Sequence, residues 1–160
     1  MFTGTAVENC LAQLGVTDVV WLPDSVMGPW EGALAASQRI ALRRVCREGE
    51  AWALAGGLWL GGRRPLVMIQ STGLFESGDA LRNMLFDFRL PLYAMVGYRS
   101  YLTADSRDTA KQFLEPVLAA WGVDWVLLKE ANDLERFSEH YSASRAAQRP
   151  GMSLLAEGAM

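Results

Sequence analysis

Short apolar runs alternate with segments of helical periodicity along this chain. The apolar runs predict six strands, at residues 18–22, 40–45, 65–70, 91–97, 124–128 and 152–156. Between them, apolar residues recur at three- and four-residue spacing and predict helices at 5–14, 29–37, 48–60, about 71–88, 109–121 and 132–147. Gly15 is placed to end the first helix, and we expect Pro116 to kink the fifth.

Uniformly apolar strands that alternate with helices are typical of a parallel sheet covered on both faces. The pattern predicts one α/β domain across residues 1–160, with three layers (α/β/α) and a six-stranded parallel sheet. In such sheets, ligands bind beyond the carboxyl ends of the strands. The residues directly after the strands are therefore the candidates for function.

Composition narrows the possible functions. The chain has 160 residues, of which 51% are hydrophobic and 21% charged, as in a globular domain. The net charge of −3 argues against a nucleic-acid partner, and the longest uncharged run, 51–62, is too short to span a membrane. The two cysteines, Cys10 and Cys46, have apolar neighbours and are predicted to be packed thiols. A reduced, cytoplasmic protein without a secretory leader is the expectation.

The single histidine, His140, excludes a multi-histidine metal site, and no metal ligands are predicted. His140 belongs to a polar helical segment, so we expect it on the surface. Carboxylates and hydroxyls are the better candidates for chemistry.

Glu48 begins a predicted helix directly after a strand. One interpretation is a carboxylate stabilised by the helix dipole. The other is a carboxyl group that faces a cleft and shares a proton with a ligand. Glu50 lies further into the helix and is the weaker candidate.

Polar residues also follow the strand at 65–70, with the sequence Gln70-Ser71-Thr72-Gly73. Ser71 or Thr72 can cap the next helix, and Gly73 can make a turn. Alternatively, these residues form a polar lip that contacts a ligand. They match neither a Walker A loop nor a dinucleotide-binding glycine motif.

Two further groups follow strands. Asp24 and Ser25 can cap the next helix, or present an acid and a hydroxyl to a cleft. Arg99 can be simply solvated, or can bind an anionic substrate group.

Four segments together resemble the pyrimidine-binding domain of thiamine-diphosphate-dependent decarboxylases: VVWLPDS at 19–25, CREGEAWALAGGLWLGGRRPLVMIQSTGL at 46–74, LRNMLFDFRLPLYAMVGYR at 81–99 and LEPVLAAWGV at 114–123. The resemblance is closest to the alpha subunit of sulfopyruvate decarboxylase and to the matching half of phosphonopyruvate decarboxylase. It covers nearly the whole chain, in order.

The resemblance implies roles for particular residues. Glu48 matches the glutamate that hydrogen-bonds N1′ of the cofactor's aminopyrimidine and so activates the cofactor, which acts as the electron sink when carbon dioxide leaves. The segment Gln70, Ser71, Thr72 and Gly73 matches the cofactor-binding turn. Asp24, Ser25 and Arg99 lie on the side expected for a 2-oxo acid that carries a second anionic group, such as a sulfonate or phosphonate.

The family's Gly-Asp-Gly motif, which holds magnesium and the cofactor diphosphate, is missing, because Ala80 follows Gly78 and Asp79. The resemblance therefore implies a beta subunit that supplies Mg2+ and diphosphate binding, in a hetero-oligomer. Met84, Phe86 and Phe88 are candidate contacts, and some of the six tryptophans would serve the same interface.

The sequence departs from the family at Ser71, Phe75, Glu76 and Tyr98, and residues 105–111 lack the usual histidine. Three alternatives stay open. The chain could belong to a thiamine-diphosphate-dependent carboligase or lyase that uses another 2-oxo acid. It could be a non-catalytic binding module that kept the fold. Flavodoxin-like nucleotide binding rests on fold class alone.

Overall fold

The computed structural model describes residues 2–130 and 132–157. The strands are β1 (Asp18–Trp21), β2 (Ala41–Arg44), β3 (Pro65–Gln70), β4 (Tyr93–Tyr98), β5 (Asp124–Leu128) and β6 (Gly151–Ala156). The α-helices are α1 (Gly4–Gln13), α2 (Glu31–Ala36), α3 (Glu48–Leu60), α4 (Ser71–Glu76), α5 (Gly78–Arg82), α6 (Ala110–Trp121) and α7 (Leu134–Ala146). A 3₁₀ turn, η1 (Gly28–Trp30), precedes α2, and a π-helical turn, η2 (Asn83–Asp87), follows α5.

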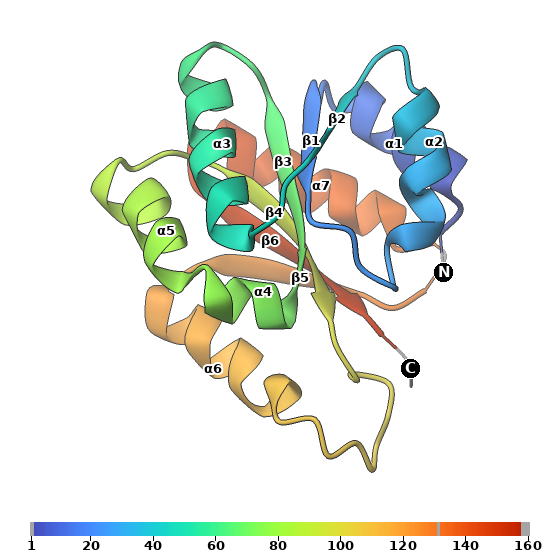
Figure 1. The fold of residues 1–160 in the computed structure, drawn as a ribbon, viewed down its shortest axis with the longest axis vertical. Helices are drawn as coiled ribbons and strands as arrows, with labels where there is room; N and C mark the ends of the chain where they lie inside the picture. The colour runs from blue at the N-terminus through green and yellow to red at the C-terminus, as the bar shows by residue number, and fades with distance from the viewer. Residues whose placement is uncertain (1, 131, 158–160) are drawn as a thin grey trace.

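All strand pairs are parallel, and the order across the sheet is β2-β1-β3-β4-β6-β5. The predicted α/β fold with a six-stranded parallel sheet is confirmed. Because the strands run the same way, their carboxyl ends lie along one edge of the sheet (Figure 1).

Helices cover both faces of the sheet. Helices α3, α4, α5 and α6 lie on one face, and α1, α2 and α7 lie on the other (Figure 1). Neighbouring strand residues contribute to opposite cores, as Val20 and Trp21 do in β1. This two-sided burial explains why the strands read as continuous apolar runs.

The single helix predicted at about 71–88 is wrong, because the segment divides into α4, α5 and η2. Ser77 lies at the first break, where its hydroxyl donates to the carbonyl oxygens of Gly73 (2.7 Å) and Leu74 (3.3 Å). A serine hydroxyl that bonds the preceding turn competes with regular helix geometry. The sequence pattern shows apolar spacing but not this competition.

Two smaller predictions also need correction. His140 is half-buried rather than on the surface, because its Nδ1 pairs with the Tyr93 hydroxyl at 2.7 Å. Cys46 is exposed in the loop before α3, whereas Cys10 is partly buried. Helix α6 runs as one helix from Ala110 to Trp121 with Pro116 inside it, and the kink at Pro116 stays a prediction.

The tryptophans divide into two groups. Trp21, Trp30 and Trp52 are fully buried, as their pattern predicts, while Trp59, Trp121 and Trp125 are only partly buried against the core. Among the described residues, each helix is too short or too polar to cross a membrane.

Candidate active site at the carboxyl edge of the sheet

The predicted site residues come from four segments that meet at the carboxyl edge of the central strands. Asp24 and Ser25 follow β1, Glu48 begins α3 after β2, Gln70 ends β3, and Arg99 follows β4. Strand β1 lies between β2 and β3, with β4 next to β3. The sheet order thus makes neighbours of segments that are up to 75 residues apart in the sequence.

Glu48 and Gly73 are in direct contact. Glu48 is the first residue of α3 and is half-buried, and its carboxylate side chain packs against the backbone of Gly73 in α4. A Cβ at position 73 would overlap the Cγ, Cδ and Oε1 atoms of Glu48. Gly73 is therefore required for close approach rather than for a turn. Glu48 also keeps the favourable position at the helix N-terminus.

Further contacts fix the start of α3 against α4. The indole Nε1 of Trp52 donates to Ser77 Oγ at 2.9 Å in the buried core. Glu76 accepts from Arg47 (3.0 Å) and from the backbone N–H of Gly49 (3.4 Å), the two residues that flank Glu48. The departure from the family at Glu76 thus gives this chain a link between α4 and the segment that carries Glu48.

Ser71 and Thr72 do not cap α4, which corrects one interpretation of this turn. The N-cap residue is Gln70, and no side chain caps the helix. Ser71 is fully buried and its Oγ has no hydrogen-bond partner. Thr72 is exposed and donates to Gln70 Oε1 at 3.2 Å. A buried hydroxyl without a partner is uncommon in proteins, and it fits the ligand-binding interpretation.

Asp24 closes a turn and does not cap the next helix, since neither η1 nor α2 has a side-chain cap. Its Oδ1 accepts from the backbone N–H groups of Val26 (2.7 Å) and Met27 (2.9 Å), so it stabilises the turn before η1. Its Oδ2 is buried without a hydrogen-bond partner. Ser25, next to it, is exposed. One carboxylate oxygen therefore holds the loop, and the other is left for a ligand.

Arg99 is half-buried and paired rather than simply solvated. Its Nε lies 2.6 Å from Oδ2 of Asp108, in the loop that leads to α6. Asp108 also accepts from the backbone N–H of Ala110 at 2.9 Å. The guanidinium is thereby held at the edge of the site, with part of its charge already balanced.

Sequence reasoning missed Glu157, which follows the last strand. It is 1% exposed, and its carboxylate oxygens lie beside the Gln70 amide without a hydrogen bond of regular geometry. Burial, with the nearby Asp24 charge next in importance, raises the pKa of Glu157 to about 7. The rule that selected the other candidates, a polar residue directly after a strand, also applies to Glu157 and could have found it.

A cavity of about 420 Å³ borders this edge of the sheet. Its lining comes from α4, from α6 and from the loop before α6. The lining residues are Thr72 and Phe75 in α4, Ala110, Phe113 and Val117 in α6, and Asp108 and Thr109 in the loop. The cavity is mostly apolar, and of the predicted site residues only Thr72 lines it.

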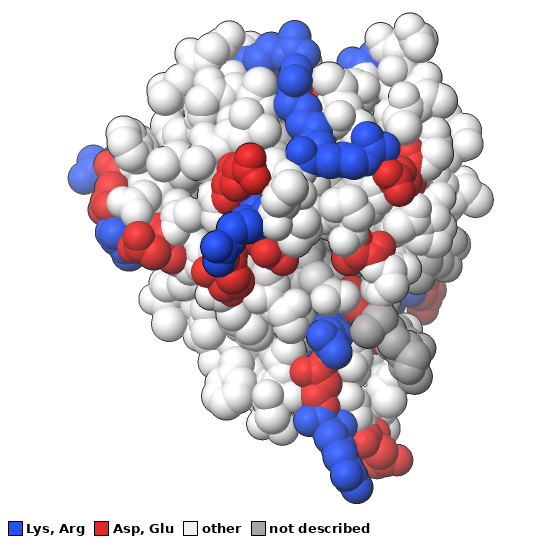
Figure 2. All heavy atoms as spheres, in the orientation of Figure 1, with Lys and Arg blue, Asp and Glu red and all other residues white. Residues whose placement is uncertain are grey.

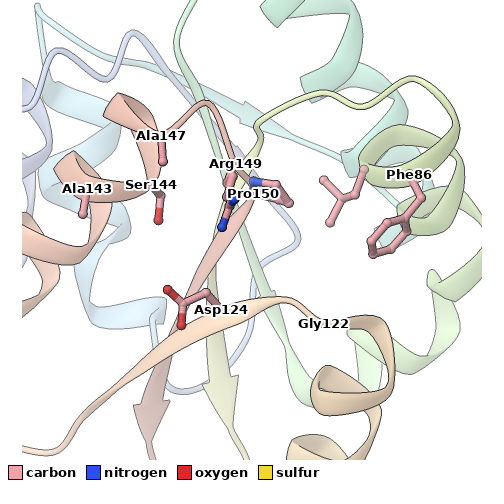
Figure 3. A pocket seen from close by; sticks show the side chains of 9 residues that line it. Phe86, Gly122, Asp124, Ala143, Ser144, Ala147, Arg149 and Pro150 are labelled. Carbon is pink, nitrogen blue, oxygen red and sulfur yellow. The ribbon is translucent and has the colours of Figure 1, made fainter.

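Another cavity, of about 440 Å³, lies at the opposite edge, where β5 and β6 begin (Figure 3). Asp124, Ser144 and Arg149 line it from separate segments, with Phe86 on its far side. It contains none of the predicted site residues. In parallel α/β sheets, ligands bind at the carboxyl edge, which favours the site around Glu48 and Glu157.

The surface above α3 to α6 is notably apolar. Among the described residues, several large apolar side chains are exposed, and most of them lie on this side of the molecule. They are Leu54 and Leu60 in α3, Phe86 and Phe88 in the segment around η2, Leu102 in the loop before α6, and Phe113 in α6. Figure 2 shows wide uncharged areas on this face, including the area over α6 at lower left. Met84, by contrast, is half-buried and packs against Gly56 of α3.

The described residues contain no group of three or more His, Cys, Asp or Glu side chains arranged to hold a metal ion. Asp79 is exposed on α5 and pairs with Arg82 at 2.9 Å.

Comparison with known proteins gives low-identity relatives among decarboxylases and a synthase. No family model matches the chain. Phosphonopyruvate decarboxylases from Streptomyces viridochromogenes and Streptomyces hygroscopicus are each 33% identical over 89 residues, which cover 56% of this chain and 22% of theirs. A 2-succinyl-5-enolpyruvyl-6-hydroxy-3-cyclohexene-1-carboxylate synthase from Geobacillus kaustophilus is 30% identical over 151 residues, covering 89% of this chain and 25% of that protein.

The crystal structure of benzoylformate decarboxylase from Polynucleobacter necessarius matches 99% of this chain and 30% of that chain, with a TM-score of 0.75 and 21% identity. This likeness confirms the fold. The chain spans about a quarter of the length of the curated relatives it matches. The sequence similarity supports a general relationship with these decarboxylases and the synthase.

Proposed function

We propose that this chain is the alpha subunit of a heteromeric thiamine-diphosphate-dependent decarboxylase that acts on a 2-oxo acid. The observation that supports it most is the packing of the Glu48 side chain against Gly73, beside the unpartnered hydroxyl of Ser71. These groups come from the two segments that the sequence resemblance assigns to the cofactor's aminopyrimidine.

The residues present fit such a ring. An aminopyrimidine offers ring nitrogens and an amino group, which need hydrogen-bond partners when buried. Glu48 would hold the proton shared with N1′, and Ser71 would contact the ring from the start of α4. Gly73 lacks a side chain, so the backbone can lie close to both Glu48 and the ligand. When bound, the cofactor supplies the electron sink for decarboxylation.

The substrate side would be formed by Asp24, Ser25, Gln70 and Arg99. Arg99 is the charged group best suited to a second anionic group, such as a sulfonate or phosphonate. Asp108 holds its guanidinium in place through the 2.6 Å contact. The phosphonopyruvate decarboxylase relatives support this choice of substrate class.

A beta subunit would supply the Gly-Asp-Gly motif, Mg2+ and diphosphate binding, and would cover the apolar face formed by α3 and the η2 segment. Helix α3 is apolar around most of its circumference, which is typical of a helix buried on all sides. Leu54 and Leu60 remain exposed in the chain alone. This exposure supports a partner on that face.

The test is to purify the chain together with the protein encoded by the neighbouring gene. Carbon dioxide release from phosphonopyruvate, sulfopyruvate, benzoylformate and pyruvate is then measured with thiamine diphosphate and Mg2+. We expect Glu48→Gln to lower kcat by about 10²- to 10⁴-fold, the range for a lost proton-transfer group. A complex that forms and turns over equally well with Glu48→Gln would contradict the proposal.

Glu50→Gln is the matched control. Glu50 is an exposed carboxylate in the same helical turn, and its Oε2 accepts from the Cys46 N–H at 3.1 Å. The amide keeps an acceptor oxygen, so kcat should stay within about twofold of the wild type.

Carboligation is the second candidate, because the synthase relative covers 89% of the chain. Product analysis separates the two functions. A decarboxylase releases a free aldehyde, whereas a carboligase gives a ligated hydroxyketone when a second carbonyl compound is present.

A further inference from the structure

Unsatisfied buried polar atoms gather at the candidate site. Among those in the described residues are Oδ2 of Asp24, Oγ of Ser71, and both carboxylate oxygens of Glu157. Buried polar groups almost always have a hydrogen-bond partner, so these atoms indicate a place for a polar ligand. Glu157 contributes two of them and has no role in the proposed chemistry so far.

The fold holds the Glu157 side chain in place. Its backbone N–H donates to the carbonyl of Tyr98 (3.2 Å), and its carbonyl accepts from the N–H of Leu102 (2.7 Å). Its carboxylate lies over Gly97 in β4, where a Cβ would overlap Oε1. The side chain is therefore packed between β4 and β6 at their carboxyl ends, beside Gln70.

Three charged groups act on Glu157 from the loops that follow β1 and β4. Asp24 lies on the β1 side, and Arg99 and Asp108 lie beyond β4. Burial raises the pKa of Glu157 to about 7, and Asp24 and Asp108 act in the same direction. The Gln70 amide and the Arg99 guanidinium act in the opposite direction. Near neutral pH, the carboxyl group therefore changes readily between its acid and its carboxylate form.

We propose that Glu157 is a substrate-binding residue whose protonated carboxyl group donates a hydrogen bond to an anionic group of the 2-oxo acid, so that substrate and proton bind together. This inference rests on the proposed function, because it needs an anionic substrate at this edge. Asp24 and Asp108 already place two carboxylates near Glu157, and Asp108 pairs with Arg99. An ionised Glu157 would add a third negative charge, whereas the neutral acid adds a donor.

Linkage gives the proposal a measurable consequence. If protonation of Glu157 strengthens substrate binding, then substrate binding must strengthen protonation by the same factor. KM should be constant below pH 7 and rise by about tenfold per pH unit well above it, while kcat changes little. Glu157→Gln keeps a neutral donor, so its KM should stay low and independent of pH.

The kinetic test uses the complex of this chain with its partner subunit, with phosphonopyruvate and pyruvate as substrates, between pH 5.5 and 8.5. Glu139→Gln, an exposed glutamate on α7, is the matched control and should follow the wild-type profile. If wild type and Glu157→Gln turn over with the same pH dependence of KM, the inference is wrong and the proposed function stands. If no 2-oxo acid is turned over by the wild-type complex, the proposed function fails first, and the inference with it.

Two measurements do not depend on turnover. Calorimetric titration of the complex with oxamate, in two buffers of different ionisation enthalpy at pH 7.5, should show proton uptake in the wild type and none in Glu157→Gln. In the free chain, the ¹³C-labelled carboxyl signal that disappears in Glu157→Gln should titrate near pH 7. A midpoint below pH 5, or equal proton uptake in both proteins, would overturn the inference.

Discussion

Two glutamates at the same edge of the sheet are held in different ways. Glu48 is half-buried at the first position of a helix, with its side chain against a glycine that leaves it space. Glu157 is almost fully buried after a strand, with its backbone hydrogen-bonded to Tyr98 and Leu102 and its carboxylate beside the Gln70 amide. A cleft-facing carboxyl suits contact with a cofactor, while a buried one responds to the charge of what binds beside it. The environment, not the residue type, separates their proposed roles.

The raised pKa of Glu157 predicts how stability depends on pH. The folded pKa of about 7 exceeds the ordinary value of 4.5, so the folded state holds the proton more tightly than the unfolded state. The resulting stabilisation is complete below about pH 4.5 and is lost as pH rises through 7. We expect the wild-type free energy of unfolding to fall by up to about 3 kcal/mol across this window. Glu157→Gln should lack this fall and be the more stable protein at pH 8.

Urea unfolding of the free chain from pH 5 to 8.5, followed by circular dichroism, measures this effect. The pH range begins at 5 because Glu8, Asp18 and Asp133 have lowered pKa values and stabilise the fold as carboxylates. Their protonation at lower pH would add a separate loss of stability. Glu139→Gln should reproduce the wild-type curve. Parallel curves for wild type and Glu157→Gln would show that burial of Glu157 does not cost free energy.

At the scale of elements, the site depends on how α3 meets α4. Three contacts join them: Glu48 with Gly73, Trp52 with Ser77, and Glu76 with Arg47 and Gly49. The Trp52 contact is buried, so it fixes the two helices more firmly than the exposed Glu76 pair does. The position of the Glu48 carboxylate follows from this junction.

Gly73→Ala tests that junction. The added Cβ would overlap the Glu48 side chain, which can move away because its end is flexible. We therefore expect a loss of kcat of at least about tenfold, with the free energy of unfolding lowered by no more than about 1 kcal/mol. Carbon dioxide release and thermal unfolding measure the two effects. Gly32→Ala on α2, where a Cβ meets nothing within 4 Å, is the control and should leave kcat unchanged.

The sequence pattern predicts the six strands because the four inner strands, β1, β3, β4 and β6, are buried on both faces, and because the partly exposed edge strands β2 and β5 still carry short apolar runs. It also predicts Glu48, Gln70 and Arg99, since each follows or ends a strand. It cannot show the contacts of Glu48 with Gly73 or of Glu157 with Gly97. Those contacts depend on the order of strands, in which β1 separates β2 from β3 and β6 lies between β4 and β5. The division of 71–88 at Ser77 likewise follows from side-chain hydrogen bonds that apolar spacing does not encode.

At the scale of the whole molecule, the two outer layers differ. None of the exposed large apolar side chains of the described residues belongs to α1, α2 or α7, whereas α3, the η2 segment and α6 carry five of them. Aromatic side chains are enriched at protein interfaces and often contribute most of the binding energy. The face over α3 and η2 is therefore the one on which we expect the proposed beta subunit to bind.

Leu60→Ser and Phe88→Ser test this surface, because these side chains are 66% and 62% exposed in the chain alone. Removing them should leave the melting temperature of the free chain within about 2 °C of the wild type, since exposed positions contribute little to stability. If they contact the partner, each substitution should raise the Kd of the complex by about tenfold or more, measured by calorimetry. Gln38→Ser, which shortens an exposed side chain on the α2 side, should leave the Kd unchanged. Unaltered binding by a variant that carries both substitutions would show that the partner binds a different face of the chain.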